Sequence, residues 1–237
     1  MNEQNLEAQG HDSELHALSR EWSEKVGRHK YTYNFTWMGR PIIQLPQDIV
    51  AMQELIFRIQ PSVIVETGVA HGGSLVMYAS MLELLGGDRE VIGVDIDIRA
   101  HNRAALEQHP MSKRIHLIQG SSVAPETVAQ VRARVAGRGP VLVTLDSNHT
   151  HQHVRDELAA YSPMVTKGSY LVVFDTLIEE MPDRCFPDRE WKKGNSPRSA
   201  VREFMQGNDR FRVDEVIDAK LLISACPGGW LECVASP

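Results

Sequence analysis

The chain has 237 residues, of which 42% are hydrophobic and 24% are charged, proportions that are ordinary for a globular protein. Its net charge of −6 and its lack of a dense Lys/Arg cluster argue against an extended nucleic-acid-binding surface. Three cysteines without CxxC spacing predict neither a disulfide framework nor a zinc site, and no apolar stretch is long enough for a signal peptide or a membrane span. We therefore expect a cytoplasmic protein with buried, reduced thiols.

The first 47 residues are expected to form an N-terminal arm, and residues 48–237 the main domain. Four apolar residues at spacings of three and four predict that the polar stretch before residue 30 is partly helical: Leu15, Leu18, Trp22 and Val26. Aromatic residues at alternate positions then predict an extended segment over 31–40 with one aromatic face: Tyr31, Tyr33, Phe35 and Trp37. That face suits stacking on a sugar or docking on a second subunit, and we favour the homo-oligomer.

From residue 48 onward, helical patterns alternate with short apolar runs. Helices are predicted over 48–59, 73–85, 99–108, 125–137 and 150–161, and strands over 63–65, 91–94, 115–118, 141–145 and 170–174. Nearly continuous apolar strands that alternate with helices are typical of a parallel sheet covered on both faces. A long irregular segment, 177–197, could cover a site. A helix over 198–205 and antiparallel strands over 211–216, 221–225 and 230–234 complete a twisted sheet of about seven strands.

Four acidic residues stand at or just past the ends of predicted strands: Glu66, Asp95, Asp146 and Asp175. Open α/β sheets bind ligands at the carboxyl ends of their strands. One acidic residue at such an end would be unremarkable, but four in one chain predict a site at this edge.

The loop after the first strand reads VIVETGVAHGGS over 63–74. Its glycine spacing differs from the GxGxxG dinucleotide fingerprint, and it lacks the GK[ST] of a phosphate-binding loop. A glutamate two residues before Gly68 favours a cofactor with a positive end, and S-adenosylmethionine has a sulfonium and an amino group but no phosphate. The alternative for Glu66 is a turn or helix-capping carboxylate. We predict a Rossmann-like class I methyltransferase fold with this cofactor.

The remaining cofactor contacts follow from position along the chain. Asp95 ends the second strand, where a carboxylate can accept hydrogen bonds from the ribose hydroxyls. Ser121 and Ser122 follow the third strand, where the adenine edge would lie, although ordinary loop serines are an equal alternative. His71 either contacts the cofactor or caps the helix. The loop itself is expected to contribute Gly68, Gly72, Gly73 and Ser74.

With these residues in view, the chain resembles the cephalosporin hydroxylase family, which has the class I methyltransferase fold and includes sugar O-methyltransferases such as rhamnosyl O-methyltransferases. The resemblance runs from about Tyr33 to the C-terminus. It rests on the blocks TWMGRPIIQLPQD (36–48), VIVETGVAHGGSLV (63–76), VIGVDIDIR (91–99), LDSNHTHQHV (145–154), GSYLVVFDT (168–176), GNSPRSAVREF (194–204) and DAKLLISACPGGWLECV (218–234). It implies methylation of a sugar hydroxyl in glycan or natural-product biosynthesis, and a homo-oligomer.

The resemblance also implies a magnesium site beside the cofactor. Related sugar methyltransferases use an Asp after the fourth strand, an acidic pair after the fifth, and a His three residues after the first Asp as base. Asp146, Asp175 and His149 match, but Phe174 stands where the first of the acidic pair belongs. Magnesium is often bound through only one or two carboxylates, with water completing the shell.

Other interpretations remain open. His149, His151 and His153 could form a metal cluster, but spacings of two on a helix point side chains apart. Ser196 and Pro197 predict a helix start, and Asn195 belongs to that turn or to the acceptor pocket. The alternative functions are an accessory protein of antibiotic modification and a non-catalytic cofactor-binding subunit with a decayed metal site. An NAD-dependent oxidoreductase is disfavoured by the loop spacing.

Overall fold

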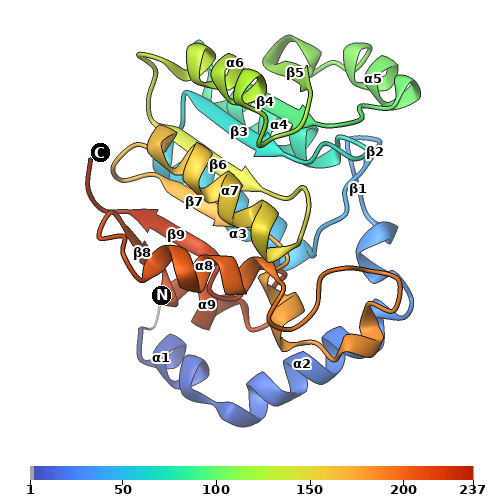
Figure 1. The fold of residues 1–237 in the computed structure, drawn as a ribbon, viewed down its shortest axis with the longest axis vertical. Coiled ribbons are helices and arrows are strands. Elements are labelled where there is room, and N and C mark those ends of the chain that lie inside the picture. The colour runs from blue at the N-terminus through green and yellow to red at the C-terminus, as the bar shows by residue number, and fades with distance from the viewer. Residues whose placement is uncertain (1–2, 237) are drawn as a thin grey trace.

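A computed structural model describes residues 3–236 and contains a seven-stranded, mostly parallel sheet with helices on both faces (Figure 1). The strand order is β5-β4-β3-β6-β7-β9-β8, and only β9 runs antiparallel to its neighbours β7 and β8. The strands are β3 (Val63–Thr67), β4 (Glu90–Asp95), β5 (Ile115–Gln119), β6 (Val141–Leu145), β7 (Tyr170–Val173), β8 (Phe211–Val213) and β9 (Trp230–Cys233). The predicted fold class is confirmed.

The helices of the main domain lie close to their predicted positions. They are α3 (Pro46–Ile59), α4 (Gly73–Leu85), α5 (Ala100–Glu107), α6 (Pro125–Val135), α7 (His151–Tyr161), α8 (Pro197–Met205) and α9 (Glu215–Leu221). Pro46 begins α3 two residues before the predicted start, because proline suits the first helical position. Ser196 caps α8 by accepting the Ser199 N–H, as its sequence predicts.

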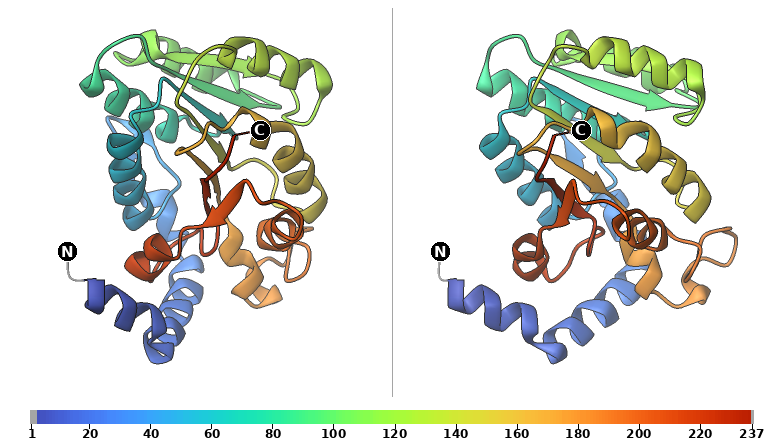
Figure 2. Two further views of the ribbon diagram at one scale, coloured as in Figure 1. Left: turned by 90° about the vertical axis from the view of Figure 1, so that its left-hand side faces the viewer. Right: turned by 60° about the vertical axis from the view of Figure 1, so that its left-hand side comes forward.

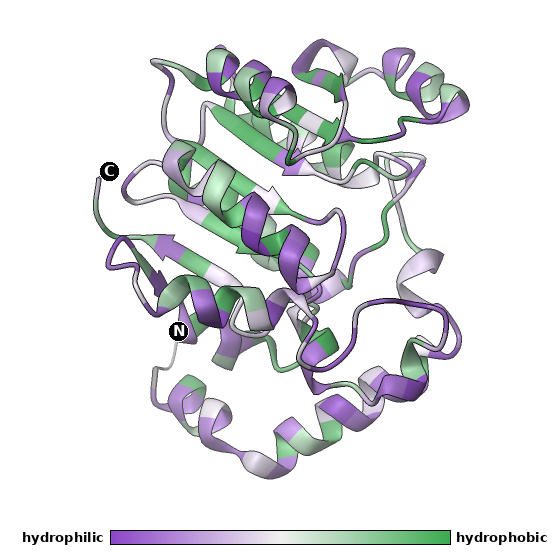
Figure 3. Cartoon of the chain, in the orientation of Figure 1, coloured by the Kyte–Doolittle hydropathy of each residue, from purple (hydrophilic) through white to green (hydrophobic). Residues whose placement is uncertain are grey.

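Alternation along each strand divides the core into two layers. Val63 and Val65 of β3 pack with α6, α7 and α8, whereas Ile64 between them packs with α3 and α4 on the opposite face. Strands that are apolar on both faces appear as the continuous hydrophobic bands of Figure 3. Because both faces are covered, the polar residues at the strand ends mark the edge of the sheet that is left for chemistry.

The N-terminal arm consists of α1 (Glu3–His11) and α2 (Ser13–Gly27), which extend along one end of the molecule (Figure 2). The Gln9 amide donates to the carbonyl of Ala219, so α1 is fastened to α9. Helix α2 contains no buried residue. By contrast, Ile42 and Leu45 are buried in the main domain. The boundary at residue 47 stays a prediction.

The predicted extended aromatic face is wrong over Tyr31–Asn34, which form a 3₁₀ turn, η1. Tyr31 packs edge-on between Trp22 and Phe35, at centroid distances of 5.3 and 5.1 Å, and these contacts favour the compact turn. The short strands β1 (Thr36–Trp37) and β2 (Arg40–Pro41) follow. The Trp37 indole donates to Ser80, so Trp37 faces the main domain rather than a shared aromatic surface.

The predicted strands over 214–216 and 221–225 are also wrong. Asp214 accepts the N–H groups of Val216 and Ile217 and thereby caps α9, and Ile217 packs against the core. The irregular segment after β7 is confirmed, with 3₁₀ turns at η4 (Thr176–Glu180) and η5 (Asp183–Cys185). Shorter 3₁₀ turns, η2 (Ser112–Arg114) and η3 (Ser162–Met164), precede β5 and β7. Within residues 3–236, no helix is both long and apolar enough to cross a membrane.

Candidate active site at the strand ends

Asp146 and Asp175 follow the adjacent strands β6 and β7, and the fold brings them together with His149. The His149 Nε2 lies 3.1 Å from Asp175 Oδ2 and 3.6 Å from Asp146 Oδ1. One ligand atom from each of the three residues falls within 4.8 Å of the others. The structure therefore places the predicted base and both predicted metal ligands in one cluster.

Asp175 is held in an uncommon backbone conformation, with φ +55°. Asp tolerates this left-handed region better than most residues. The next residues fix it in place: the Thr176 hydroxyl donates to the Pro227 carbonyl, and the Leu177 N–H donates to the Ala225 carbonyl. Residues 225–227 thus act as the support on which the Asp175 turn rests.

That support is itself fastened by Asp48 in the first turn of α3. One Asp48 oxygen accepts the Ser224 hydroxyl at 2.6 Å, and the other accepts the Ala225 N–H at 2.8 Å. Asp48 is fully buried, and burial raises its pKa to about 7 despite these two hydrogen bonds. The sequence carries no signal for this role of Asp48, because an acidic residue in a first helical turn is ordinarily a surface feature.

Charge within the cluster shifts both His149 and Asp146. Burial lowers the pKa of His149, but the charges of Asp175 and Asp146 outweigh it and raise the pKa to about 9. Burial raises the pKa of Asp146 to about 6, aided by the charge of Asp175 and opposed by His149. The two carboxylates lie close together and both repel negative charge, so they favour a positive group between them. The cluster can accept a divalent cation or a proton on His149.

The glycine loop joins this cluster directly. Asp146 N–H donates to the Thr67 carbonyl, and a Cβ on Gly68 would lie 1.8 Å from the Asp146 carbonyl oxygen. Gly68 also has φ +92°, which favours glycine. The other two glycines are required by packing as well, since a Cβ on Gly73 would meet the Pro41 carbonyl at 2.1 Å and one on Gly72 would meet Leu106.

Glu66 is fully buried beside this loop. Its Oε2 accepts the Ser74 hydroxyl at 2.7 Å, whereas its Oε1 has no hydrogen-bond partner among residues 3–236. Burial raises the pKa of Glu66 well above its ordinary value, and the Ser74 hydrogen bond opposes that rise. A buried carboxyl with one unpartnered oxygen is suited to bind a positively charged donor. No side chain in the described part of the chain caps the start of α4, so the helix-capping alternative for Glu66 is wrong.

Asp95 contacts the same loop from the end of β4. It accepts N–H groups from Val69, Ala70 and Asp97 at 2.8, 3.2 and 3.0 Å. The bonds from Val69 and Ala70 hold the loop in shape, and the predicted contact with ribose hydroxyls stays a prediction. Beyond Asp95, Ile96 is 72% exposed at the same edge of the sheet.

The other predicted cofactor residues are distributed around this edge. Ser122 is buried and its hydroxyl lies 3.0 Å from the His153 Nε2, whereas Ser121 is partly exposed. His71 is partly exposed, and its carbonyl accepts the Arg40 guanidinium at 3.0 Å. The sequence had no local signal for Arg40, which reaches the loop from β2.

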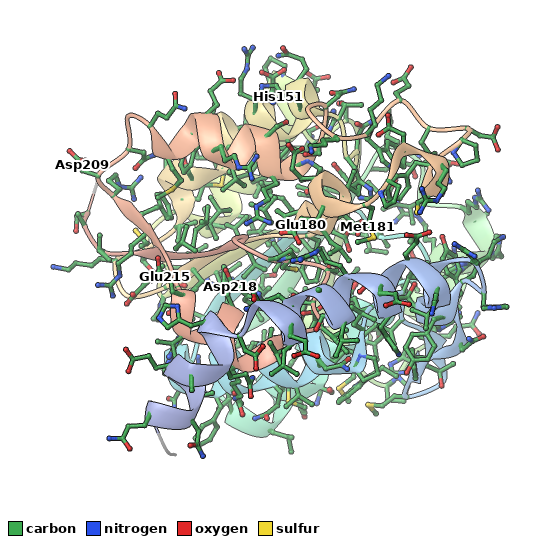
Figure 4. The ribbon with its side chains drawn as sticks, turned by 90° about the horizontal axis from the view of Figure 1, so that it is seen from below. His151, Glu180, Met181, Asp209, Glu215 and Asp218 are labelled. Carbon is green, nitrogen blue, oxygen red and sulfur yellow. The ribbon has the colours of Figure 1, made fainter. Side chains whose placement is uncertain are left out.

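The three histidines of the 149–153 stretch diverge, in agreement with the disfavoured cluster. His151 lies 2.8 Å from both Ser199 and Glu203 of α8 and projects from α7 (Figure 4). His153 turns to the opposite side, 3.1 Å from Ser147 and 3.4 Å from the buried Glu157. Asn195 accepts the His151 N–H at 2.9 Å, so it secures the start of α7.

A cavity of about 710 Å³ opens above the cluster. Its floor contains Asp146, His149 and Asp175, and one wall comes from α2 and η1 of the arm. Aromatic side chains from distant parts of the chain line it: Trp22, Tyr31, Tyr33, Phe174, Phe186 and Trp191. Its volume lies in the usual range for small-molecule sites.

Two segments close the cavity. The irregular segment after β7 supplies Trp191, whose ring centroid lies 4.9 Å from that of His149. Arg184 of that segment pairs with Glu24 of α2 at 2.8 Å, and Arg20 approaches Glu180 at 3.9 Å. Figure 4 shows Glu180 and Met181 beside α2. The sequence placed a covering segment here but did not identify Trp191, because an irregular stretch carries no periodic signal.

The family described as rhamnosyl O-methyltransferase/CmcI matches residues 29–234. The chain belongs to the rhamnosyl O-methyltransferase/CmcI family. A rhamnosyl O-methyltransferase of Mycobacterium leprae is 32% identical over 162 residues, which are 65% of this chain and 68% of that protein. A rhamnosyl O-methyltransferase of Mycobacterium tuberculosis is 30% identical over 164 residues, 65% of this chain and 64% of that protein.

Solved structures agree on the fold. A CmcI structure with magnesium and S-adenosylmethionine superposes with a TM-score of 0.62 at 20% identity, covering 86% of this chain and 78% of that one. A structure of MycE, a methyltransferase from the mycinamycin biosynthetic pathway, with magnesium and S-adenosylhomocysteine gives 0.51 at 21% identity, covering 77% and 43%. The predicted family is confirmed.

At the position where the resemblance predicts the first residue of an acidic pair, this chain has Phe174. Its ring is 2% exposed, packs in the core and forms part of the cavity floor. The Phe174 N–H donates to the Leu145 carbonyl, which keeps it in line with β6. The carboxylates at this point of the cluster are therefore Asp146 and Asp175.

Proposed function

We propose that this protein is an S-adenosylmethionine-dependent O-methyltransferase that methylates a sugar hydroxyl, of rhamnose or a similar glycosyl group, with the assistance of a divalent cation. The proposal rests on one observation above all: the Asp146–His149–Asp175 cluster lies between the glycine loop and an aromatic-lined cavity. Methyl transfer requires donor, acceptor and base at one place, and this edge of the sheet offers a surface for each.

The glycine loop suits the cofactor. Close backbone packing at Gly68 and Gly73 leaves the loop a fixed shape, and Asp95 holds it through the N–H groups of Val69 and Ala70. Glu66 offers a buried carboxylate oxygen to the positive end of S-adenosylmethionine. The exposed Ile96 beside Asp95 would give the flat adenine ring an apolar contact.

Magnesium fits the donor set. Asp146 and Asp175 supply two carboxylates, which meets the minimum for this cation when water and substrate complete the shell. When bound, the cation would lower the pKa of a coordinated hydroxyl and neutralise the carboxylate charge that raises the pKa of His149. Asp146 and Asp175 would hold it.

His149 would then act as the base. Its Nε2 faces the two carboxylates on the cavity floor, where it can take the proton of the acceptor hydroxyl as the oxygen attacks the methyl group. The Trp191 ring packs against the imidazole and restricts its orientation. Tyr31 and Trp191 on the walls offer flat apolar faces to a sugar ring, and the ion pair of Arg184 with Glu24 joins the two segments that close the cavity.

A second candidate is a cofactor-binding protein without methyltransferase activity. Phe174 favours it, because the acidic pair expected from the resemblance is reduced to Asp175. A role as an accessory protein of antibiotic modification is a further alternative within the family. The predicted cytoplasmic location and homo-oligomer stay predictions.

The test is transfer of a labelled methyl group from S-adenosylmethionine to a panel of rhamnosylated and otherwise glycosylated acceptors, with magnesium and with a chelator. We expect turnover that needs magnesium and is lost in Asp146→Ala. Cofactor affinity without turnover on any acceptor would favour the non-catalytic candidate. No affinity for S-adenosylmethionine would contradict both.

A further inference from the structure

Gln44 is a buried polar side chain at the cavity to which the site described above gives no role. It is 3% exposed, and neither its Oε1 nor its Nε2 has a hydrogen-bond partner among residues 3–236. It lines the cavity together with Asp146. A buried amide without a hydrogen-bond partner is costly, and one that lines a cavity can be satisfied by a molecule bound there.

The backbone holds Gln44 beside the cofactor loop. Its segment leaves β2 and runs directly over the start of α4, where a Cβ on Gly73 would meet the Pro41 carbonyl at 2.1 Å and the Ile42 Cα at 2.7 Å. Ile42 and Leu45, on either side, are buried and anchor the segment in the core. The position of Gln44 is therefore fixed relative to the glycine loop.

Tyr78 connects Gln44 with Glu66. Burial raises the pKa of Tyr78 well above its ordinary value, the charge of Glu66 raises it further, and a contact with the Gln44 side chain opposes that rise. This contact brings the two side chains together but does not meet the distance and angle of a hydrogen bond. The Tyr78 hydroxyl and the Glu66 Oε1 are also buried without a partner in the described chain. Three neighbouring side chains thus present unpaired donors and acceptors at one place, one of them a carboxylate.

We propose that Gln44 binds the amino-acid end of the cofactor, with Glu66 accepting from its ammonium group and the Gln44 amide donating to its carboxylate. This inference rests on the proposed function. An α-amino acid zwitterion suits these side chains, because the Gln44 amide offers both a donor and an acceptor while Glu66 offers negative charge.

The test compares two ligands by calorimetric titration of the full-length protein. S-adenosylhomocysteine carries the amino-acid end, and 5′-methylthioadenosine has the same thioether nucleoside without it. In Gln44→Met, which keeps the side-chain volume, we expect the affinity for S-adenosylhomocysteine to fall about 10- to 100-fold. The affinity for 5′-methylthioadenosine should stay within about twofold of wild type.

Gln47→Met is the matched control. Gln47 lies three residues further on, in the first turn of α3, and also has an unpartnered Oε1 in the described chain, but it does not line the cavity. We expect this variant to bind both ligands as wild type does. Gln44→Glu provides a second variant, which should likewise weaken S-adenosylhomocysteine alone because it brings a carboxylate toward the ligand's own.

Three outcomes separate the possibilities. Equal losses for both ligands in Gln44→Met would give Gln44 a purely structural role and overturn the inference. An unchanged affinity for S-adenosylhomocysteine would also overturn it, and would make the acceptor the candidate ligand of Gln44. If wild-type protein binds neither nucleoside, the proposed function itself is wrong.

Discussion

Gly68 and Asp146 meet backbone to backbone: a Cβ on Gly68 would lie 1.8 Å from the Asp146 carbonyl oxygen, and Asp146 N–H donates to Thr67 immediately before Gly68. The predicted cofactor loop and the predicted metal loop are therefore one packed junction. A substitution that shifts one loop should also shift the other, because neither backbone has room to move independently.

We expect Gly68→Ala to disable this junction. Alanine would be strained at φ +92° and its Cβ would collide with backbone, so S-adenosylhomocysteine affinity should fall at least about 10-fold and the melting temperature by several degrees. Gly137→Ala is the control, since Gly137 also has positive φ but open space around it. It should lower stability by about 1 kcal/mol and leave affinity unchanged. Equal effects of the two substitutions on affinity and stability would show that they arise from backbone strain alone and not from the contact between Gly68 and Asp146.

The carboxylate pair predicts the metal dependence of the reaction. Asp146→Asn and Asp175→Asn each remove one charged ligand, so we expect half-maximal activity to require at least about 10-fold more magnesium and kcat to fall by about 100-fold or more. Asp209→Asn, at an exposed position that does not line the cavity, should match wild type. Titration of activity with magnesium distinguishes them. Unchanged magnesium requirements in both site variants would remove these residues from the metal site.

His149 predicts the pH profile. The charges of Asp175 and Asp146 raise its pKa to about 9 in the metal-free protein, and a bound cation should bring it down. A base works when unprotonated, so kcat/KM should rise with pH through a pKa below about 9. His149→Gln should lower kcat by about 10²- to 10⁴-fold and abolish this limb. A variant with the wild-type profile would point to another base.

Asp48 predicts how stability depends on pH. Its folded pKa of about 7 exceeds the unfolded value of about 3.9, so the folded state retains a proton that the unfolded state releases between those values. Stability from this group is full below pH 4 and declines as the pH rises to 7. The unfolding free energy of wild type relative to Asp48→Asn should therefore fall from pH 5 to pH 7.5, by up to about 2.5 kcal/mol.

Urea unfolding of the two proteins at both pH values measures this difference. Asp209→Asn, at an exposed position, serves as the control and should show a constant difference from wild type. A gap between wild type and Asp48→Asn that is constant or widens toward pH 7.5 would mean that Asp48 is already ionised in the folded protein at pH 5.

Two segments that were predicted to be extended form a turn and a helix for the same physical reason. Residues 31–34 and 214–225 have apolar residues at spacings that suit strands, but contacts with distant residues decide their form. Tyr31 packs against Trp22, and Asp214 caps a helix whose opposite side receives α1. Local periodicity cannot record a partner about 200 residues away, such as Gln9 on Ala219.

The sequence by itself determined the parallel sheet and the edge at which its chemistry lies, because strands buried on both faces must be continuously apolar and polar residues can stand only at their ends. It therefore predicted Glu66, Asp95, Asp146 and Asp175 at one edge. Only the tertiary structure decided that His149 lies between two carboxylates, that Trp191 packs on it, and that Gln44 is buried beside the cofactor loop. These are relations between loops, and a loop takes its course from the distant surface on which it rests.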